Sequence, residues 1–311
     1  MRALVFTDVN VVQVLDVPDV EATPNELVIH VERSGICGSE LHGIRHAGFR
    51  VPPLVLGHEF VGRTSDGRRV AVNPLISCGT CTYCLTSRSQ LCAQRVLLGA
   101  HRAGGAAERV TVPSHLVHDI PDELDMDRAG LIEPVANALH AWRLAGEPSA
   151  RRVAIIGCGA IGLACLEVAR HFGASYVTGV DLAEERRTVA LGLGADEVTD
   201  ELTDTYDVIF DAVGTAATHA ASVRHLVAGG TTVWLGLLSP ESGFDAVDAV
   251  RWEKNVRGMF AYDDRTFVDA IALAPHLDLR WATTVNLEEG ADIFTRLMNG
   301  ASTPIKVLLA P

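Results

Sequence analysis

The feature that most constrains the fold is a glycine pattern near the middle of the chain. It has the form Gly-x-Gly-x-x-Gly and includes Gly157, Gly159, Ala160, Ile161 and Gly162. An apolar run at residues 153–156 precedes it, and residues 160–172 read as a helix that ends at Gly173. A strand, a glycine turn and a helix in this order let a pyrophosphate approach backbone N–H groups at the start of the helix. The pattern therefore predicts a dinucleotide site.

A carboxylate follows the pattern at the expected place. Asp181 lies about 20 residues beyond the last glycine, at the end of a second apolar run. There it would hold a ribose diol and repel a 2′-phosphate, so NAD is favoured over NADP, although the nearby Arg186 could attract that phosphate. Val213 and Gly214, after a later strand, are further candidate cofactor contacts. The alternative is a glycine-rich turn in an α/β domain that binds no nucleotide.

The chain changes character after residue 150. Short β-branched runs, broken by Gly, Pro, Asp and Asn, occupy the first 120 residues and are typical of an irregular antiparallel sheet. Beyond them predicted strands alternate with helices; the strands are residues 153–156, 176–180, 207–210 and 231–235, and the helices are residues 160–172, 182–191 and 216–227. This alternation predicts a parallel sheet with helices on both faces.

Two domains are expected, because 311 residues are about twice the length of a typical domain. Residues 143–263 are assigned to a Rossmann domain with a doubly wound parallel sheet, and residues 1–142 to a mainly β domain. Residues 264–311 contain a helix at 265–274, a strand near 283, a helix at 287–298 and a strand at 305–309. This tail is too short for a third domain, so we expect it to join the first.

The charge balance limits the possible partners. The formal net charge is −13, whereas nucleic acids and anionic membranes require basic faces that neutralise phosphates. We therefore expect a small-molecule substrate, no nucleic acid and no membrane. No signal-peptide pattern is visible, which predicts a cytoplasmic protein. In that reducing compartment the seven cysteines are expected as metal ligands, catalytic thiols or core residues such as Cys158 and Cys165.

One group of cysteines has the spacing of a metal site. The pattern C-x2-C-x2-C-x7-C comprises Cys78, Cys81, Cys84 and Cys92. Four thiolates in a short loop can close a tetrahedral zinc site, and because no ligand position stays open the zinc would be structural. A zinc-ribbon module that binds nucleic acid is the alternative, but no basic, aromatic stretch accompanies the cysteines.

A second set of residues suits a catalytic metal. Cys37, His58, Glu59 and Glu133 supply one thiolate, one imidazole and two carboxylates. Three such ligands with a fourth position open make a Lewis-acidic zinc. Taken singly, Cys37 could be a core thiol, His58 a turn histidine and Glu133 an acid at the start of a helix.

Taken together, these motifs and their order resemble the zinc-dependent medium-chain alcohol dehydrogenase family, most closely its polyol branch. The resemblance covers almost the whole chain. It implies an α/β protein with a GroES-like, mainly β catalytic domain and a Rossmann domain. It also implies two zinc ions, one catalytic and one structural, with NAD as cofactor.

The resemblance assigns Cys37 and His58 to the catalytic zinc, completed by a water and by Glu59 or Glu133. Glu59 would then be both a ligand and a catalytic residue. Glu133 is interpreted as the glutamate that stands in this branch where other members have a second cysteine. Glu40 would orient the ring of His58, although family members usually have Asp at that place.

The same resemblance implies a proton relay through Ser39 and His42, and a basic residue, Lys306, near the metal-side glutamate. It predicts an enzyme that transfers hydride between a secondary alcohol or polyol and NAD. An amino-alcohol or aminocyclitol dehydrogenase of a biosynthetic pathway is one alternative, and a non-catalytic protein that binds zinc and nucleotide is another. A homodimer or homotetramer is implied by resemblance alone.

Overall fold

The computed structural model describes residues 1–45, 48–147, 149–301 and 304–311. The chain divides into two compact units. Unit 1 comprises Met1–Glu133, Tyr262–Pro275 and Leu279–Pro311, and unit 2 comprises Pro134–Ala261 and His276–Asp278. The sequence predicts the first domain boundary after residue 142, whereas in the structure helix α4 (Ile132–Leu144) lies almost wholly in unit 2.

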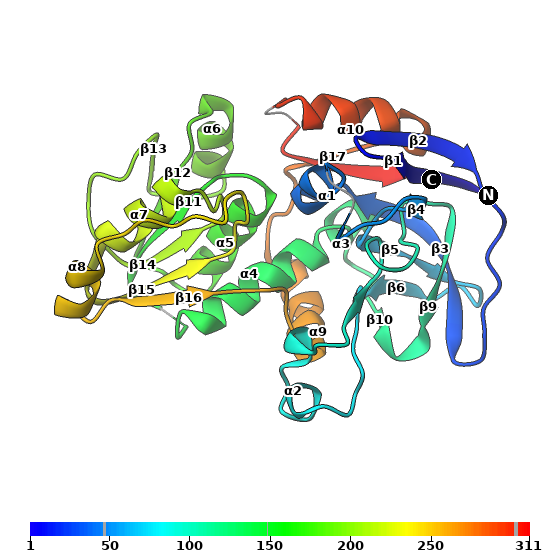
Figure 1. Ribbon diagram of the computed structural model, residues 1–311, viewed down its shortest axis with the longest axis horizontal. Helices are drawn as coiled ribbons and strands as arrows, with labels where there is room; N and C mark the ends of the chain where they lie inside the picture. Colours follow the sequence, from blue (N-terminus) through cyan, green and yellow to red (C-terminus); the bar gives the residue numbers. More distant parts are fainter. Residues whose placement is uncertain (46–47, 148, 302–303) are drawn as a thin grey trace. The chain divides into compact units, whose positions relative to one another are not determined.

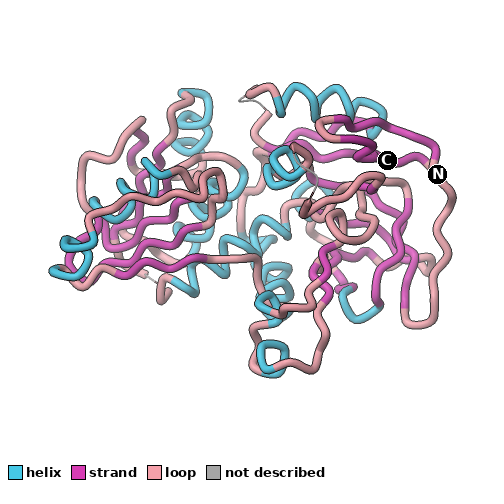
Figure 2. The backbone as a smooth tube through the Cα atoms, in the orientation of Figure 1, coloured by secondary structure: helices cyan, strands magenta, loops and turns pink. Residues whose placement is uncertain are grey.

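Unit 2 contains a six-stranded parallel sheet in the order β13-β12-β11-β14-β15-β16. Its strands are β11 (Arg152–Ile156), β12 (Tyr176–Val180), β13 (Glu197–Thr199), β14 (Tyr206–Asp211), β15 (Leu226–Trp234) and β16 (Asn255–Gly258). Its helices are α4, α5 (Ala160–His171), α6 (Glu184–Gly192), α7 (Ala216–Arg224) and α8 (Ala246–Arg251) (Figures 1 and 2). The strand order reverses between β11 and β14, which confirms the doubly wound Rossmann fold.

The core of unit 2 lies between this sheet and its helices. Val153 is fully buried in β11, as is Leu163 in α5, because a parallel sheet covered on both faces needs continuous apolar strands. Cys158 and Cys165 are each 1% exposed, and burial raises the pKa of both thiols to about 12. Both cysteines are therefore core residues, as expected.

Unit 1 is mainly β. A seven-stranded sheet has the order β10-β6-β5-β3-β18-β17, with β9 also paired to β3, and a second sheet has the order β2-β1-β4. The strands are β1 (Arg2–Asp8), β2 (Val11–Asp16), β3 (Glu26–Gly35), β4 (Leu54–Val55), β5 (Glu59–Thr64), β6 (Arg69–Val72), β7 (Leu75–Ile76), β8 (Val96–Leu97), β9 (Arg109–Pro113), β10 (Val117–Asp119), β17 (Ala282–Asn286) and β18 (Lys306–Ala310). The helices are α1 (Gly38–Gly43), α2 (Thr82–Leu85), α3 (Met126–Ala129), α9 (Asp264–Leu273) and α10 (Gly290–Met298).

The C-terminal strand β18 joins residues 264–311 to the first part of the chain. β18 pairs with β3, with Leu308 opposite Gly35. Phe294 of α10 is fully buried in one apolar cluster with Phe6 and Leu309. This packing places Lys306 and the segment after β3 in the same unit.

Two predicted helices differ from the structure. The helix predicted at 216–227 ends at Arg224, because Leu226 starts β15 by pairing with Tyr206 and is buried there. Strand pairing thus overrides local helix propensity. The helix predicted at 287–298 is a single 3₁₀ turn, Leu287–Glu289, followed by α10.

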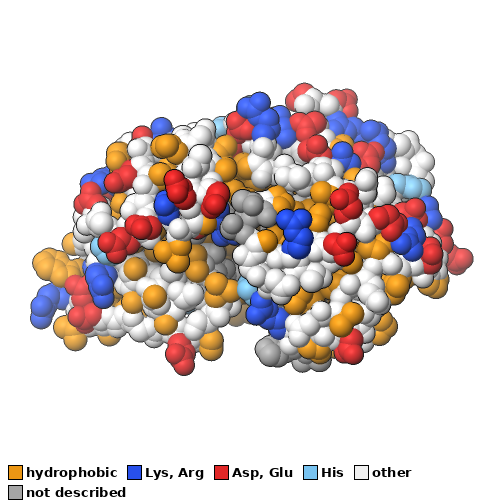
Figure 3. Space-filling model, turned by 90° about the horizontal axis from the view of Figure 1, so that it is seen from above, with side chains coloured by type: hydrophobic (Ala, Val, Ile, Leu, Met, Phe, Trp, Pro, Cys, Tyr) orange, Lys and Arg blue, Asp and Glu red, His pale blue; other side chains and the backbone are white. Residues whose placement is uncertain are grey.

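The surface carries charges of both signs. On the face shown in Figure 3, Lys and Arg side chains lie among Asp and Glu side chains. Within the described ranges of the chain, no helix has the length and apolar character needed to cross a bilayer.

Candidate active site

The predicted ligands Cys37, His58 and Glu59 lie beside one another in unit 1. Cys37 caps the N-terminus of α1, just after β3, and His58 immediately precedes β5, whose first residue is Glu59. Gly35 pairs with Glu59 in the antiparallel β3–β5 ladder, which brings the two segments together. One ligand atom from each of the three residues lies within 4.8 Å of the others. A sulfur, a nitrogen and an oxygen leave one position of a tetrahedral zinc ion open.

The environment of Glu59 fits a bound cation. Glu59 is 1% exposed, and its Oε1 accepts no hydrogen bond from the described part of the chain. Its Oε2 is paired with the Lys306 ammonium, which also donates to the carbonyl O of Ile36 at 2.9 Å. Burial lowers the pKa of Lys306, but the charges of Glu59 and Cys37 outweigh burial and raise it. Because a buried carboxylate oxygen without a partner is costly, a zinc ion suits these residues.

Glu40 holds the ring of His58, as the resemblance implies. Glu40 Oε1 lies 3.0 Å from His58 Nδ1 and accepts a hydrogen bond from the Gly57 N–H at 2.9 Å, while Oε2 accepts one from the Cys37 N–H at 3.2 Å. Burial raises the pKa of Glu40, but His58 and the charge of Arg50 lower it to about 2. The carboxylate therefore fixes Nδ1 as the donor and leaves Nε2 for a metal. Glutamate reaches His58 although the family usually has the shorter aspartate here.

Glu133 lies outside the set of three converging ligand atoms. Its Oε1 accepts a hydrogen bond from the Tyr262 hydroxyl at 2.8 Å, and both side chains are buried. Burial and the charge of Glu59 raise the pKa of Glu133 to about 7. Of the two glutamates left open by the sequence, Glu59 thus has the better placement as a resting ligand. The sequence does not predict the Tyr262 contact, because 129 positions separate the two partners along the chain.

The predicted relay residues lie on α1. Ser39 Oγ donates to Cys37 Sγ at 3.3 Å, which places the hydroxyl beside the three ligands. His42 lies one turn further along and is exposed to solvent. Burial of part of the ring and the charge of Arg45 lower the pKa of His42, so its imidazole is neutral at neutral pH.

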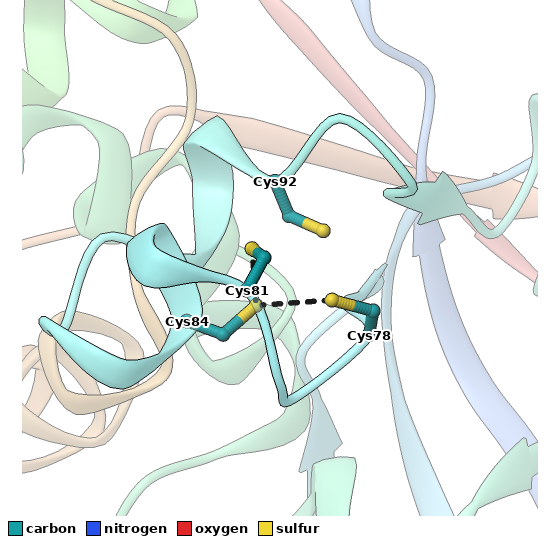
Figure 4. Close-up of side chains that lie close together, drawn as sticks. All are labelled: Cys78, Cys81, Cys84 and Cys92. Carbon is teal, nitrogen blue, oxygen red and sulfur yellow. Dashed lines mark hydrogen bonds between the residues drawn. The ribbon is translucent and has the colours of Figure 1, made fainter.

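The four-cysteine group forms the predicted cluster (Figure 4). Strands β7 and β8 pair and close the loop that carries it. Cys84 Sγ lies 3.5 Å from Cys81 Sγ and 3.8 Å from Cys78 Sγ, too far for disulfides, and Cys92 is fully buried. Hydrogen bonds from the backbone N–H groups of Thr80 and Cys81 lower the pKa of Cys78 to about 6. Four converging thiols fit a structural zinc ion.

The glycine pattern of unit 2 lies between β11 and α5. Gly159 is the N-cap of α5. The backbone N–H groups of the first turn, which includes Ala160 and Ile161, therefore point out of the N-terminal end of the helix and can bind a ligand there. A Cβ atom on Gly162 would lie 1.7 Å from the carbonyl O of Gly157, so this close approach requires glycine. A Cβ atom on Gly159 would meet no atom within 4 Å. This open space at a helix N-terminus fits a pyrophosphate.

Asp181 directly follows β12 and is fixed beside the glycine turn. Its Oδ2 accepts a hydrogen bond from the Cys158 N–H, and its Oδ1 accepts one from the Ala183 N–H, each at 2.9 Å. Arg186 Nη1 lies 3.7 Å from Asp181 Oδ2. A carboxylate held in this way suits a ribose diol, with a cation close by.

The backbone amides of Val213 and Gly214, two residues expected to contact the cofactor, are bonded to a side chain of unit 2. Their N–H groups both donate to Asp211 Oδ1, at 2.9 and 3.0 Å. Asp211 ends β14 and is fully buried. Both backbone amides therefore already have a hydrogen-bond partner within unit 2.

Two family profiles match the chain. Residues 23–122 match the alcohol dehydrogenase GroES-like domain, and residues 160–275 match zinc-binding dehydrogenase. L-threonine 3-dehydrogenase of Streptomyces avermitilis is 32% identical over 300 residues, covering 85% of this chain and 86% of that protein. The chain belongs to the zinc-dependent medium-chain alcohol dehydrogenase family. Membership makes it an oxidoreductase that uses zinc and a nicotinamide dinucleotide.

Three further proteins are similar to this chain in sequence or in structure. L-idonate 5-dehydrogenase of Vitis vinifera is 31% identical over 271 residues, covering 77% of this chain and 74% of that protein. A protein described as a zinc-binding dehydrogenase from Sinorhizobium meliloti, solved with NADP, is 30% identical with a TM-score of 0.93, covering 100% of this chain and 99% of that one. Galactitol-1-phosphate dehydrogenase from Escherichia coli is 26% identical with a TM-score of 0.91, covering 100% of both chains. The predicted family, its polyol and threonine branch, and the GroES-like and Rossmann folds are confirmed.

Proposed function

We propose that this chain is an NAD-dependent dehydrogenase of a secondary alcohol or polyol, with Cys37, His58 and Glu59 as the ligands of its catalytic zinc. The observation that carries the proposal is the convergence of one ligand atom from each of these residues, together with a buried Glu59 oxygen that accepts no hydrogen bond from any described residue. The names of the relatives, which are idonate, threonine and galactitol-1-phosphate dehydrogenases, support a substrate with several hydroxyl groups or with an amino group beside the hydroxyl.

Each side chain of the proposed site would have a separate role in hydride transfer. When bound, zinc would act as a Lewis acid on the substrate hydroxyl, and NAD would accept the hydride. Glu40 keeps the His58 ring oriented, and Lys306 balances the charge of Glu59. Ser39 Oγ, which lies beside Cys37, would accept the hydroxyl proton and release its own, and the neutral imidazole of His42 would accept the relayed proton and release it to solvent.

A substrate panel tests the proposal. Zinc-replete protein is mixed with NAD and with polyols, simple secondary alcohols and amino alcohols, and NADH formation is followed by absorbance. We expect turnover with polyols or secondary alcohols. A clear preference for amino alcohols would favour the amino-alcohol alternative. Absence of turnover across the whole panel would contradict the proposed activity and revive the non-catalytic one.

Removing the Asp181 carboxylate should change the cofactor preference. Asp181→Ala removes the partner of the ribose diol and the negative charge that would repel a 2′-phosphate, while the positive charge of Arg186, whose Nη1 lies 3.7 Å from Asp181 Oδ2 in the unaltered protein, stays close to that position. A hydrogen bond to a charged group is worth about 1.5–3 kcal/mol, so the ratio of kcat/KM for NAD over NADP should fall by about 10- to 100-fold. Arg186→Ala is the matched control and should lower activity with NADP only. An unchanged ratio in Asp181→Ala would remove Asp181 from the cofactor site.

The proposed proton relay through His42 should determine how kcat/KM depends on pH. His42 accepts a proton only when neutral, so kcat/KM should rise as pH increases through its pKa, which partial burial and the Arg45 charge hold low. Arg45→Gln removes that charge, raises the pKa of His42 and should shift the acidic limb of the profile to higher pH. Arg45→Lys keeps the charge and should leave the limb in place. If Arg45→Gln and His42→Ala both leave the profile unchanged, His42 is a surface histidine only.

A homodimer or homotetramer is implied by the family, and the edge of the unit 2 sheet offers a surface for it. β16 is the last strand of that sheet, and Val250 and Trp252 just before it are 80% and 50% exposed. Sedimentation of the purified protein tests the assembly. We propose a cytoplasmic location, because none of the seven cysteines forms a disulfide and thiolate ligands persist in a reducing compartment.

A further inference from the structure

A buried arginine lies beside the active site and has no role in the chemistry described above. Arg50 lies in the loop between α1 and β4, and its side chain is only 1% exposed. Its Nη1 donates to the carbonyl O of Ser39 at 2.9 Å, and its Nε donates to the carbonyl O of Gly99 at 3.0 Å. Burying a guanidinium costs free energy of folding unless hydrogen bonds compensate for the lost water, so a buried arginine below Ser39 suggests a specific role.

The two carbonyl groups belong to segments that flank His58. Ser39 lies on α1 next to Glu40, which holds the His58 ring and the Gly57 N–H. Gly99 packs against the backbone of Gly57, where an added Cβ atom would come within 2.7 Å. Arg50 therefore closes a ring of contacts that runs from Ser39 through Glu40 and Gly57 to Gly99.

The helix makes room for this guanidinium. A Cβ atom on Gly43, at the end of α1, would lie 2.3 Å from Arg50 Nη1. The planar fork of arginine donates in two directions at once, which a lysine ammonium on a flexible chain does less well. The Arg50 charge also acts on the Glu40 carboxylate.

We infer that Arg50 is a positioning residue, whose guanidinium holds Ser39 and, through Glu40, the imidazole of His58 in place for catalysis. The inference deepens the proposed function and rests on it. Residues that orient metal ligands from outside the ligand set typically change metal affinity or activity by about 10- to 100-fold when they are replaced. Arg50 reaches the ligands through one more residue, so we expect effects toward the lower end of that range.

The test compares Arg50→Met with Arg69→Met. Arg69 is a matched control because it also donates to backbone carbonyls in unit 1, to Pro121 at 3.1 Å and Asp122 at 2.8 Å, at the end of the β5–β6 ladder away from Glu59. Two readouts are used: the rate at which pyridine-2,6-dicarboxylate removes the less tightly held zinc, and kcat and KM for the best alcohol of the panel. Arg50→Met should release that zinc about 10-fold faster and lose kcat rather than KM. Arg69→Met should lower only the melting temperature.

Two additions keep the outcome clear. Guanidinium chloride at a concentration below that which unfolds the protein should restore part of kcat in Arg50→Met, whereas equal sodium chloride should not. Should Arg50→Met fail to fold, Arg50→Lys, which keeps the charge, is tested in its place. It should still have a lower kcat than the unaltered protein, but the loss should be smaller than the loss of about 10-fold expected of Arg50→Met. If the Arg50 variants behave like Arg69→Met, with zinc release and kcat unchanged, Arg50 only stabilises the fold. If the unaltered protein shows no turnover, the proposed function fails, while zinc release still tests the inference.

Discussion

Cys37→Ser is expected to lower kcat by about 1,000-fold or more and to remove the catalytic zinc. The thiolate is the one sulfur among the three converging ligand atoms, and a hydroxyl is a far weaker ligand for zinc. Lewis-acid stabilisation is worth several kcal/mol, and each 1.36 kcal/mol corresponds to a factor of ten in rate. Steady-state kinetics and zinc content per chain measure the two effects.

Cys165→Ser is the matched control for this change. Cys165 is a buried core thiol of unit 2 and holds no ligand position. Its substitution should cost stability, because it buries a hydroxyl among apolar side chains, and should leave zinc content unchanged. Equal zinc content and equal kcat in Cys37→Ser and in the unaltered protein would contradict the assignment of Cys37.

Cys92→Ser is expected to lower the melting temperature by about 10 °C or more. Cys92 is fully buried in the four-cysteine cluster, and the zinc that such a cluster holds contributes directly to folding. In a domain of 150–250 residues each kcal/mol lost lowers the melting temperature by roughly 2–4 °C, so a loss of several kcal/mol gives this shift. Calorimetry and zinc content are the measurements.

Leu85→Ser provides the control within the same loop. Leu85 is 73% exposed, so its replacement should change stability little. If Cys92→Ser retains both its zinc and the melting temperature of Leu85→Ser, the cluster has no structural metal.

The sequence predicts best those sites whose parts are close along the chain. The glycine pattern, Asp181 and the four cysteines each belong to one continuous stretch, where local turn and helix geometry places the groups. The Rossmann strands follow from apolar runs, because a buried parallel sheet leaves a clear pattern. Family resemblance added Cys37 and His58 as zinc ligands with Glu59 or Glu133 as the third, and it also added the relay residues and the Glu40 contact.

Contacts between distant segments could not be read in this way. The choice between Glu59 and Glu133 depends on the register of β3 against β5, which pairs Gly35 with Glu59. The hydrogen bond from Tyr262 to Glu133 and the place of Arg50 beneath Ser39 depend on tertiary packing. The start of β15 at Leu226 likewise follows from pairing with β14 rather than from local propensity.

The most direct test of the central claim is anomalous scattering at the zinc edge from crystals of the zinc-loaded protein. Two peaks are expected. One should lie within the four-cysteine cluster, and the other should lie within bonding distance of Cys37 Sγ, His58 Nε2 and a Glu59 carboxylate oxygen, at about 2.0–2.3 Å. A fully loaded protein with a peak at the four cysteines and none beside Cys37 and His58 would contradict that claim.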